Sequence, residues 1–190
     1  MRAGGTVAAA AGVALLLAGC GADPVLLDRA DFPGATSVKQ DAWGGSTPGA
    51  TWCSGLGSVQ YAAGGEVSSW LSFGDHGDAG ATLIDRSADR ASAEHLAGMI
   101  AEQATVCAES DAATTGGASI EPLDGLDDGE RGWTTRTPDG EWGQYALVPL
   151  DDWRLLAVGF STTDDEAPVE LTDLIDRARE GAEQFPPEQP

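Results

Sequence analysis

Residues 132–162 read GWTTRTPDGEWGQYALVPLDDWRLLAVGFST, and this stretch decides the fold. It is rich in aromatic, β-branched and other apolar residues, and two turn signals interrupt it. Pro138-Asp139-Gly140 makes the first turn, because Pro presets φ and Gly accepts a positive φ. Asp151-Asp152 makes the second. The three predicted strands are residues 132–137, 142–150 and 153–162.

The third of these strands differs from the other two. Leu155, Leu156, Ala157, Val158 and Phe160 place apolar side chains on both of its faces. A strand at the edge or on the surface of a sheet alternates polar and apolar residues instead. The pattern therefore predicts that residues 153–162 form a central strand.

Further strands are expected towards the N-terminus. Residues 67–73 alternate with period two, and residues 81–85 form a second apolar run after the turn at residues 74–78, which predicts a hairpin. Residues 52–62 are a weak strand candidate. Residues 34–50, rich in Gly, Ser, Thr and Pro, predict a loop, and residues 24–30 predict a short helix that ends near Pro33.

Two amphipathic helices are predicted, at residues 88–108 and 168–184, because apolar residues recur on one face of each. Pro168 suits the first turn of the second helix. The acidic, Gly-rich residues 109–130 predict a long loop with one short strand near Ile120. We therefore predict an α+β fold, a mostly antiparallel sheet with amphipathic helices packed on one face.

The N-terminus has the pattern of an export signal. Arg2 precedes an apolar run at residues 7–18 that is too short to span a bilayer. Leu17-Ala18-Gly19-Cys20 resembles the lipobox of bacterial lipoproteins, in which the Cys thiol receives a diacylglycerol before cleavage. The alternative is an ordinary secretory signal with a chance Cys at the cut. We expect a signal peptide at 1–19, a lipidated tether at 20–24, one domain at 25–185 and a tail at 186–190.

The net charge excludes some partners. The chain has 10 Lys and Arg against 31 Asp and Glu, and cleavage removes Arg2, which leaves 9 − 31 = −22. Such a surface repels nucleic acid and anionic lipid head groups. We therefore expect no nucleic-acid partner. The acidity is explained either by solubility and codon bias, which we favour, or by an acidic docking face.

With Cys20 assigned to the lipid, Cys53 and Cys107 remain. Two cysteines in an exported chain favour a disulfide. The bond would close a loop of 107 − 53 = 54 residues, for which the chain-entropy model gives about 4 kcal/mol. A redox-active pair is the alternative, but the close Cys-x-x-Cys spacing is absent.

No pattern of catalytic residues is visible in the sequence. A Gly-x-Ser-x-Gly elbow is missing, and the chain has two His. His76 lies in a predicted turn with Asp75 and Asp78, which is either a metal or acid–base site or, as we favour, a solvated turn. His95 lies beside the apolar stripe of a predicted helix.

Metal and cofactor signals are also weak. Residues 124–130 have the oxygen density that calcium prefers but lack the EF-hand order, and no Cys/His cluster suits zinc. The Gly pairs are not followed by the Lys of a phosphate loop. We predict no metal and no cofactor. A ligand cleft lined by Trp133 and Trp142 is one hypothesis, and a role as core or cross-strand partners is the favoured one.

The order of these elements resembles that of actinobacterial sensor-like lipoproteins, which are similar to the extracellular sensor domain of the mycobacterial receptor kinase PknH. The shared features are the lipobox ending at Cys20, an opening helix near Leu26-Leu27, a strand region that begins with Cys53, an Ala-rich helix ending in Cys107, a meander led by Trp133 and a final helix that contains Leu171. The resemblance implies an α+β fold with a cleft that binds or senses an extracellular ligand. The sensor domain of that kinase has two disulfides, whereas this chain can form only one.

We therefore expect a membrane-anchored lipoprotein on the extracytoplasmic face of the cell membrane, in the cell envelope. It is not an enzyme, and it binds or senses a small molecule or an envelope partner through residues that the sequence does not identify. Two alternatives remain open. One is a carrier of an apolar, lipid-like ligand, and the other is an envelope hydrolase that uses a pair of carboxylates.

Overall fold

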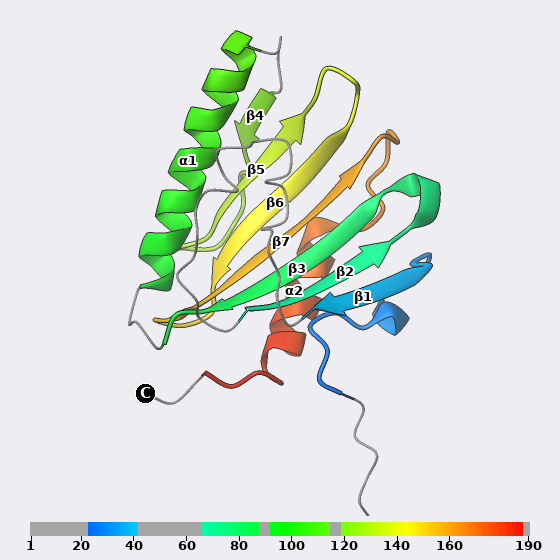
Figure 1. Cartoon of the computed structure of the whole chain (residues 1–190), viewed down its shortest axis with the longest axis vertical. Coiled ribbons are helices and arrows are strands. Elements are labelled where there is room, and N and C mark those ends of the chain that lie inside the picture. The colour runs from blue at the N-terminus through cyan, green and yellow to red at the C-terminus, as the bar shows by residue number, and fades with distance from the viewer. Residues whose placement is uncertain (1–22, 42–65, 88–91, 115–118, 188–190) are drawn as a thin grey trace, which may run out of the picture.

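The computed structural model describes residues 23–41, 66–87, 92–114 and 119–187, with the backbone alone at 39–41, 66, 103 and 107–114. Within these ranges the strands form a seven-stranded antiparallel sheet in the order β1-β2-β3-β7-β6-β5-β4 (Figure 1). The strands are β1 (Ser37–Asp41), β2 (Glu66–Ser72), β3 (Asp78–Asp85), β4 (Ser119–Pro122), β5 (Arg131–Arg136), β6 (Trp142–Pro149) and β7 (Arg154–Thr162).

The chain builds the sheet from both edges. Strands β1 to β3 form one meander, and the helix α1 (Ala93–Thr114) then connects β3 to β4 at the opposite edge. Strands β4 to β7 return towards the middle, where β7 pairs with β3 on one side and β6 on the other. The α+β class, the mostly antiparallel sheet and the central position of β7 are confirmed.

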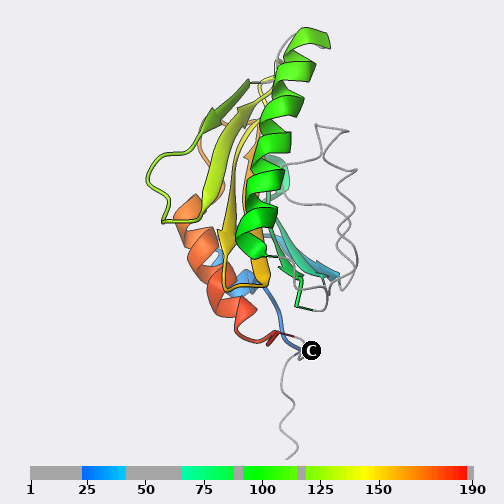
Figure 2. The same cartoon turned by 90° about the vertical axis from the view of Figure 1, so that its left-hand side faces the viewer.

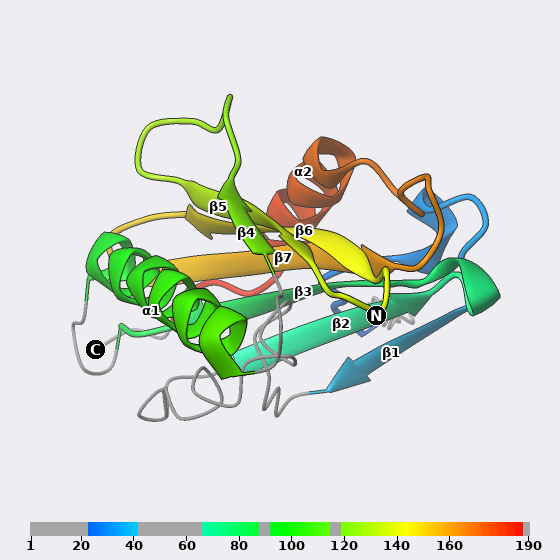
Figure 3. The ribbon, with the colours of Figure 1, turned by 90° about the horizontal axis from the view of Figure 1, so that it is seen from above.

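The prediction that the helices share one face of the sheet is wrong. Helix α1 lies on one face and helix α2 (Leu171–Ala182) on the other (Figures 2 and 3). On β7, Leu155 and Ala157 pack beneath α1, whereas Leu156, Val158 and Phe160 pack beneath α2. The physical reason is that a strand apolar on both faces needs cover on both faces to remove its side chains from water.

Two hydrophobic cores result, and β7 contributes to both. The α1-side core contains Ile84, Ala93, Leu96, Ala97, Ile100, Ala104, Trp133, Tyr145, Leu147, Leu155 and Ala157. The α2-side core is larger and contains Leu26, Leu27, Phe32, Leu71, Phe73, Ala79, Ala81, Leu83, Ala146, Val148, Leu156, Val158, Phe160, Leu171, Leu174, Ile175, Ala178 and Ala182.

Helix α2 is shorter than the predicted 168–184. Its buried residues follow the spacing of one helical face, which packs on the sheet. Pro168 lies before the helix and not in its first turn, because the chain is still extended at Glu170. At the other end Arg154 Nη1 donates to the carbonyl of Phe185 at 2.8 Å, which ties the end of the helix region to the start of β7.

Helix α1 begins at Ala93 and runs to Thr114, six residues beyond the predicted end at 108. The hydroxyl of Ser92 accepts a 3.3 Å hydrogen bond from the amide of His95 at the start of the helix. The loop predicted at 109–130 therefore begins too early, since Ala and Glu residues continue the helix. The short strand predicted near Ile120 is confirmed as β4.

The helix predicted at 24–30 is wrong. Only the 3₁₀ turn η1 (Arg29–Asp31) forms, whereas Leu26 and Leu27 enter the α2-side core, each 1% exposed. Tertiary contacts replace helical hydrogen bonds here, because the amide of Leu27 donates to Ser69 Oγ at 3.3 Å. Gly181 permits this approach, since a Cβ there would lie 2.1 Å from the carbonyl oxygen of Leu26.

The hairpin predicted at 67–73 and 81–85 is confirmed as β2 and β3, joined through the 3₁₀ turn η3 (Gly74–His76). The loop predicted at 34–50 is wrong in part, because residues 37–41 pair with β2 as the edge strand β1. The signal peptide, Cys20, Cys53 and the strand at 52–62 lie outside the described residues. None of the described helices is long and apolar enough to cross a membrane.

Candidate functional site

An open groove of about 420 Å³ runs between η1 and the exposed side of α2, and we call it the α2 groove. It is built from three segments that are far apart in the sequence, residues 31–33, residue 73 and residues 168–180. Its lining consists of Asp31, Phe32, Pro33, Phe73, Pro168, Val169, Glu170, Asp173, Asp176, Arg177 and Glu180. Its volume lies within the range of about 300–1,000 Å³ that is usual for small-ligand sites.

The floor of the α2 groove is fixed by its contact with the core. Phe32 and Phe73 are 5% and 6% exposed and belong to the α2-side core. The carboxylate of Asp28 accepts a 2.9 Å hydrogen bond from the amide of Ala30 and so caps η1, which presents Phe32 to the core. Gly34, with φ at 96°, then turns the chain away towards β1. These contacts anchor the floor.

The rim of the groove is strongly acidic. Because α2 buries one face, residues at helical spacing on its other face turn to solvent, and these are Asp173, Asp176, Arg177 and Glu180. Asp31 and Glu170 add two more exposed carboxylates from η1 and from the residue before the helix. The groove therefore combines an apolar floor with five carboxylates and one guanidinium.

That guanidinium belongs to Arg177. Its Nη1 donates to Glu180 Oε2 at 2.8 Å, and its side chain is 46% exposed. The hydrogen bond from Arg177 to Glu180 is the main reason that the pKa of Arg177 is raised, and the charges of Glu180, Asp31 and Asp173 raise it further. The rim thus stabilises a positively charged group inside the groove.

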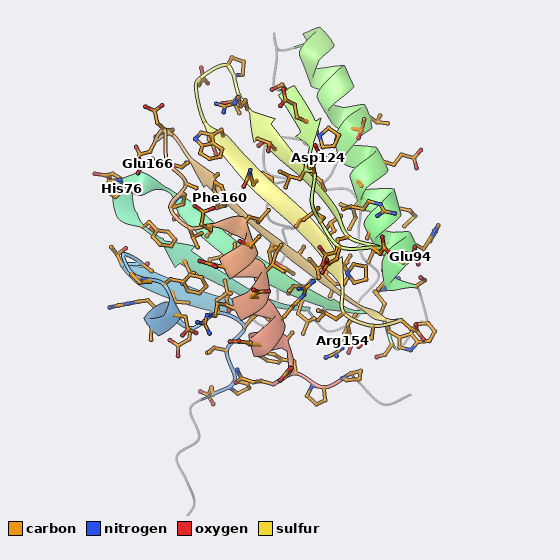
Figure 4. All side chains as sticks on the ribbon, turned by 180° about the vertical axis from the view of Figure 1, so that it is seen from behind. His76, Glu94, Asp124, Arg154, Phe160 and Glu166 are labelled. Atoms are coloured by element: carbon orange, nitrogen blue, oxygen red, sulfur yellow. The ribbon has the colours of Figure 1, made fainter. Side chains whose placement is uncertain are left out.

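His76 lies at the end of the sheet opposite Arg154, near Glu166 (Figure 4). Its Nδ1 lies 2.7 Å from Asp164 Oδ2, and its side chain is 75% exposed. The hydrogen bond with Asp164 raises the pKa of His76. The hydroxyl of Thr162 donates to the carbonyl of His76 at 2.7 Å, so this hydrogen bond joins the η3 turn to the end of β7.

The acidic loop at residues 124–130 makes a structural contact. Glu130 forms an ion pair with Arg179 of α2, and its second carboxylate oxygen accepts a 3.0 Å hydrogen bond from the amide of Asp127. Among the described residues, no group of three or more His, Cys, Asp or Glu is arranged to hold a metal ion.

The hypothesis that Trp133 and Trp142 line one cleft is wrong, because they lie on opposite faces of the sheet. Trp133 is buried in the α1-side core, where its ring centroid lies 6.2 Å from that of Tyr145. Trp142 packs against the α2-side core, edge-on to Phe160 at 5.3 Å. Burial raises the pKa of Tyr145 to about 12, so this phenol is a neutral hydrogen-bonding group at physiological pH.

The predicted lipidation site and disulfide are not tested by the structure. Cys20 and Cys53 lie outside the described residues, and Cys107 lies on α1, where the backbone alone is described. His95 lies exposed on the first turn of the same helix. His95 is not part of the lining of the α2 groove.

No protein-family model matches the chain, and no curated protein matches it.

None of the residues of the α2 groove was predicted from the sequence to belong to a binding site. One signal was available, since Asp173, Asp176 and Glu180 recur at the spacing of a helical face that is opposite the apolar one. Their meeting with Asp31, about 140 residues earlier in the chain, depends on how η1 docks beside α2. That docking has no local sequence signal.

Proposed function

We propose that this protein is a non-enzymatic lipoprotein of the cell envelope, held at the extracytoplasmic face of the membrane by a lipid on Cys20. It binds or senses a small ligand or an envelope partner, and the α2 groove is its binding site. The observation that supports this proposal is the groove itself, a hollow of about 420 Å³ with an anchored apolar floor and a charged rim. Binding sites combine these features, because apolar contact supplies affinity and a few polar groups fix orientation.

The groove fits the two alternatives less well. A hydrolase of the carboxylate type needs one carboxyl group that burial keeps protonated near neutral pH. The five carboxylates of the groove are all exposed. A carrier of an apolar ligand needs an enclosed apolar cavity, whereas the rim of the groove is charged and open to solvent. Binding without chemistry is the simpler account of these residues.

The lipid anchor can be tested by replacing the thiol. Cys20→Ser removes the sulfur that forms the thioether, and we expect the protein to move from the membrane fraction to the soluble fraction. Mass spectrometry of the wild-type protein from membranes should show a chain that begins at a diacylated Cys20. An unacylated chain that begins at Met1 would contradict the proposed location.

The binding site can be tested by filling the groove. Val169→Trp places a large ring in the lining, and Val38→Trp makes the same change on the edge strand β1, where Val38 is 42% exposed. A library of small fragments is screened by NMR against the full chain in neutral detergent micelles. We expect fragment-induced shifts at groove amides that Val169→Trp abolishes and Val38→Trp leaves intact.

Two results would count against the α2 groove as the site. Fragments that shift amides elsewhere, and are insensitive to Val169→Trp, would place binding on another surface. A screen without any shift in the groove would remove the basis of the proposal.

A further inference from the structure

We propose that the ligand of the α2 groove is an organic cation, an alkylammonium or guanidinium group whose hydrocarbon stem packs on the groove floor. This inference rests on the proposed function and adds the chemical class of the ligand. Three features of the described residues carry it: the charge of the rim, the cation that already lies in the groove, and the apolar floor beneath both.

The charged residues that line the groove carry a net charge of minus four, from the carboxylates of Asp31, Glu170, Asp173, Asp176 and Glu180 and the guanidinium of Arg177. One of these carboxylates, Asp176, also lies 3.7 Å from Nη1 of Arg179, which is outside the lining. These carboxylates lie on two separate elements, on η1 and at or near α2, and they surround one hollow. Field lines from like charges around a concave surface add up and raise the local concentration of the opposite ion. An anionic ligand would be repelled at the same site.

Arg177 shows how the rim holds a cation. Its guanidinium pairs with Glu180 at 2.8 Å and lies in the field of Asp31 and Asp173. A ligand cation would use the same carboxylates and would compete with Arg177 for them. Arg177 therefore competes with a ligand cation for the rim carboxylates. Replacing Arg177 should strengthen binding, whereas replacing one of the carboxylates should weaken it.

The floor decides between a hydrated metal ion and an organic cation. Pro33, Pro168 and Val169 offer apolar surface above the buried rings of Phe32 and Phe73, and a hydrated inorganic ion does not use such surface. The hydrocarbon stem of an alkylamine or an arginine-like group does use it, because long cationic chains bury their methylene groups and keep the charge at the surface. The two ends of such a ligand match the floor and the rim.

Calorimetry on the full chain in neutral detergent micelles tests this inference. The probes are spermidine, which represents a free polyamine, and acetyl-trilysine amide, which represents lysine side chains of a peptide. Acetyl-triglutamine amide is the neutral comparison. We expect both cationic probes to bind and the neutral peptide to fail. Raising the salt should weaken binding, because the Debye length falls from about 10 Å at 0.1 M to about 3 Å at 1 M.

Three variants separate the local charge from the charge of the whole protein. Asp173→Asn removes one rim carboxylate and should weaken binding about two- to five-fold, the range for an exposed ion pair. Asp139→Asn makes the same change in the β5–β6 turn, outside the groove, and should leave the affinity unchanged. Arg177→Gln should strengthen binding by a similar factor.

The outcomes distinguish this inference from the proposed function. Neutral fragments that occupy the groove, with no binding of either cation, would refute the cationic ligand and leave the groove as a binding site. Equal effects of Asp173→Asn and Asp139→Asn would refute it too, because the attraction would then come from overall charge. Weaker binding by Arg177→Gln would contradict the role of Arg177 as a competitor.

Discussion

The adjacent residues Leu155 and Leu156 on β7 give the sharpest test of the architecture. Both are 0% exposed, and they point into the α1-side and α2-side cores, respectively. Leu→Ala removes three carbon atoms, so at about 0.8 kcal/mol for each buried CH₂ the transfer contribution is about 2.4 kcal/mol. The cavity left behind raises the usual cost to about 3–5 kcal/mol. We therefore expect Leu155→Ala and Leu156→Ala to lower the free energy of unfolding by similar amounts.

The assay is equilibrium unfolding in urea, followed by tryptophan fluorescence. Val38→Ala serves as the control, because Val38 is 42% exposed and its truncation should change stability by less than about 0.5 kcal/mol. If helices covered one face of the sheet only, one of the two Leu residues would face water. A cost below about 1 kcal/mol for either Leu variant, beside a large cost for the other, would refute the two-sided arrangement.

Two further predictions concern close packing and pH. A Cβ at Gly159 would lie 2.1 Å from the Tyr145 ring, so Gly159→Ala should destabilise the protein by at least about 1–3 kcal/mol. A Cβ at Gly98 on α1 meets open space, so the control Gly98→Ala should stabilise the protein by about 0.5–1 kcal/mol. Thermal unfolding measures both changes. Asp164 raises the pKa of His76 above its usual value of 6.5. The stability that the contact between His76 and Asp164 adds to the folded state is therefore complete below pH 6.5, and it is lost as the pH rises through the raised pKa of the folded state. Asp164→Asn should lower the pKa of His76 in an NMR titration, and an unchanged value would contradict the pairing.

The strands could be predicted from the sequence where the pattern is local. Residues 132–162 carry their own turn signals, and the three strands, their antiparallel order and the central place of β7 follow from them. The prediction that both helices lie on one face of the sheet was wrong, although residues 132–162 also indicate that both faces are covered. Leu155 and Leu156 bury opposite faces of one strand, which requires a layer on each side of the sheet.

The N-terminal region and the candidate site could not be predicted in this way. Leu26 and Leu27 suggest a helix, but their backbone is used in contacts with β2 and α2 that are 42 or more residues away. The α2 groove depends on the same packing, because η1 lies beside α2 only after Leu26, Leu27 and Phe32 have entered the α2-side core. Sequence spacing shows an acidic helix face but not the segment opposite to it.

The last strand of the chain, β7, occupies the middle of the sheet, and this order has a consequence for folding. Among the described strands, the two three-stranded meanders, β1–β3 and β4–β6, are joined in the sheet only through β7. Until residues 154–162 emerge during synthesis, each meander has an unpaired inner edge that other chains can join. A chain that ends before residue 154 should therefore aggregate, and assembly of the sheet must wait for a late, long-range step.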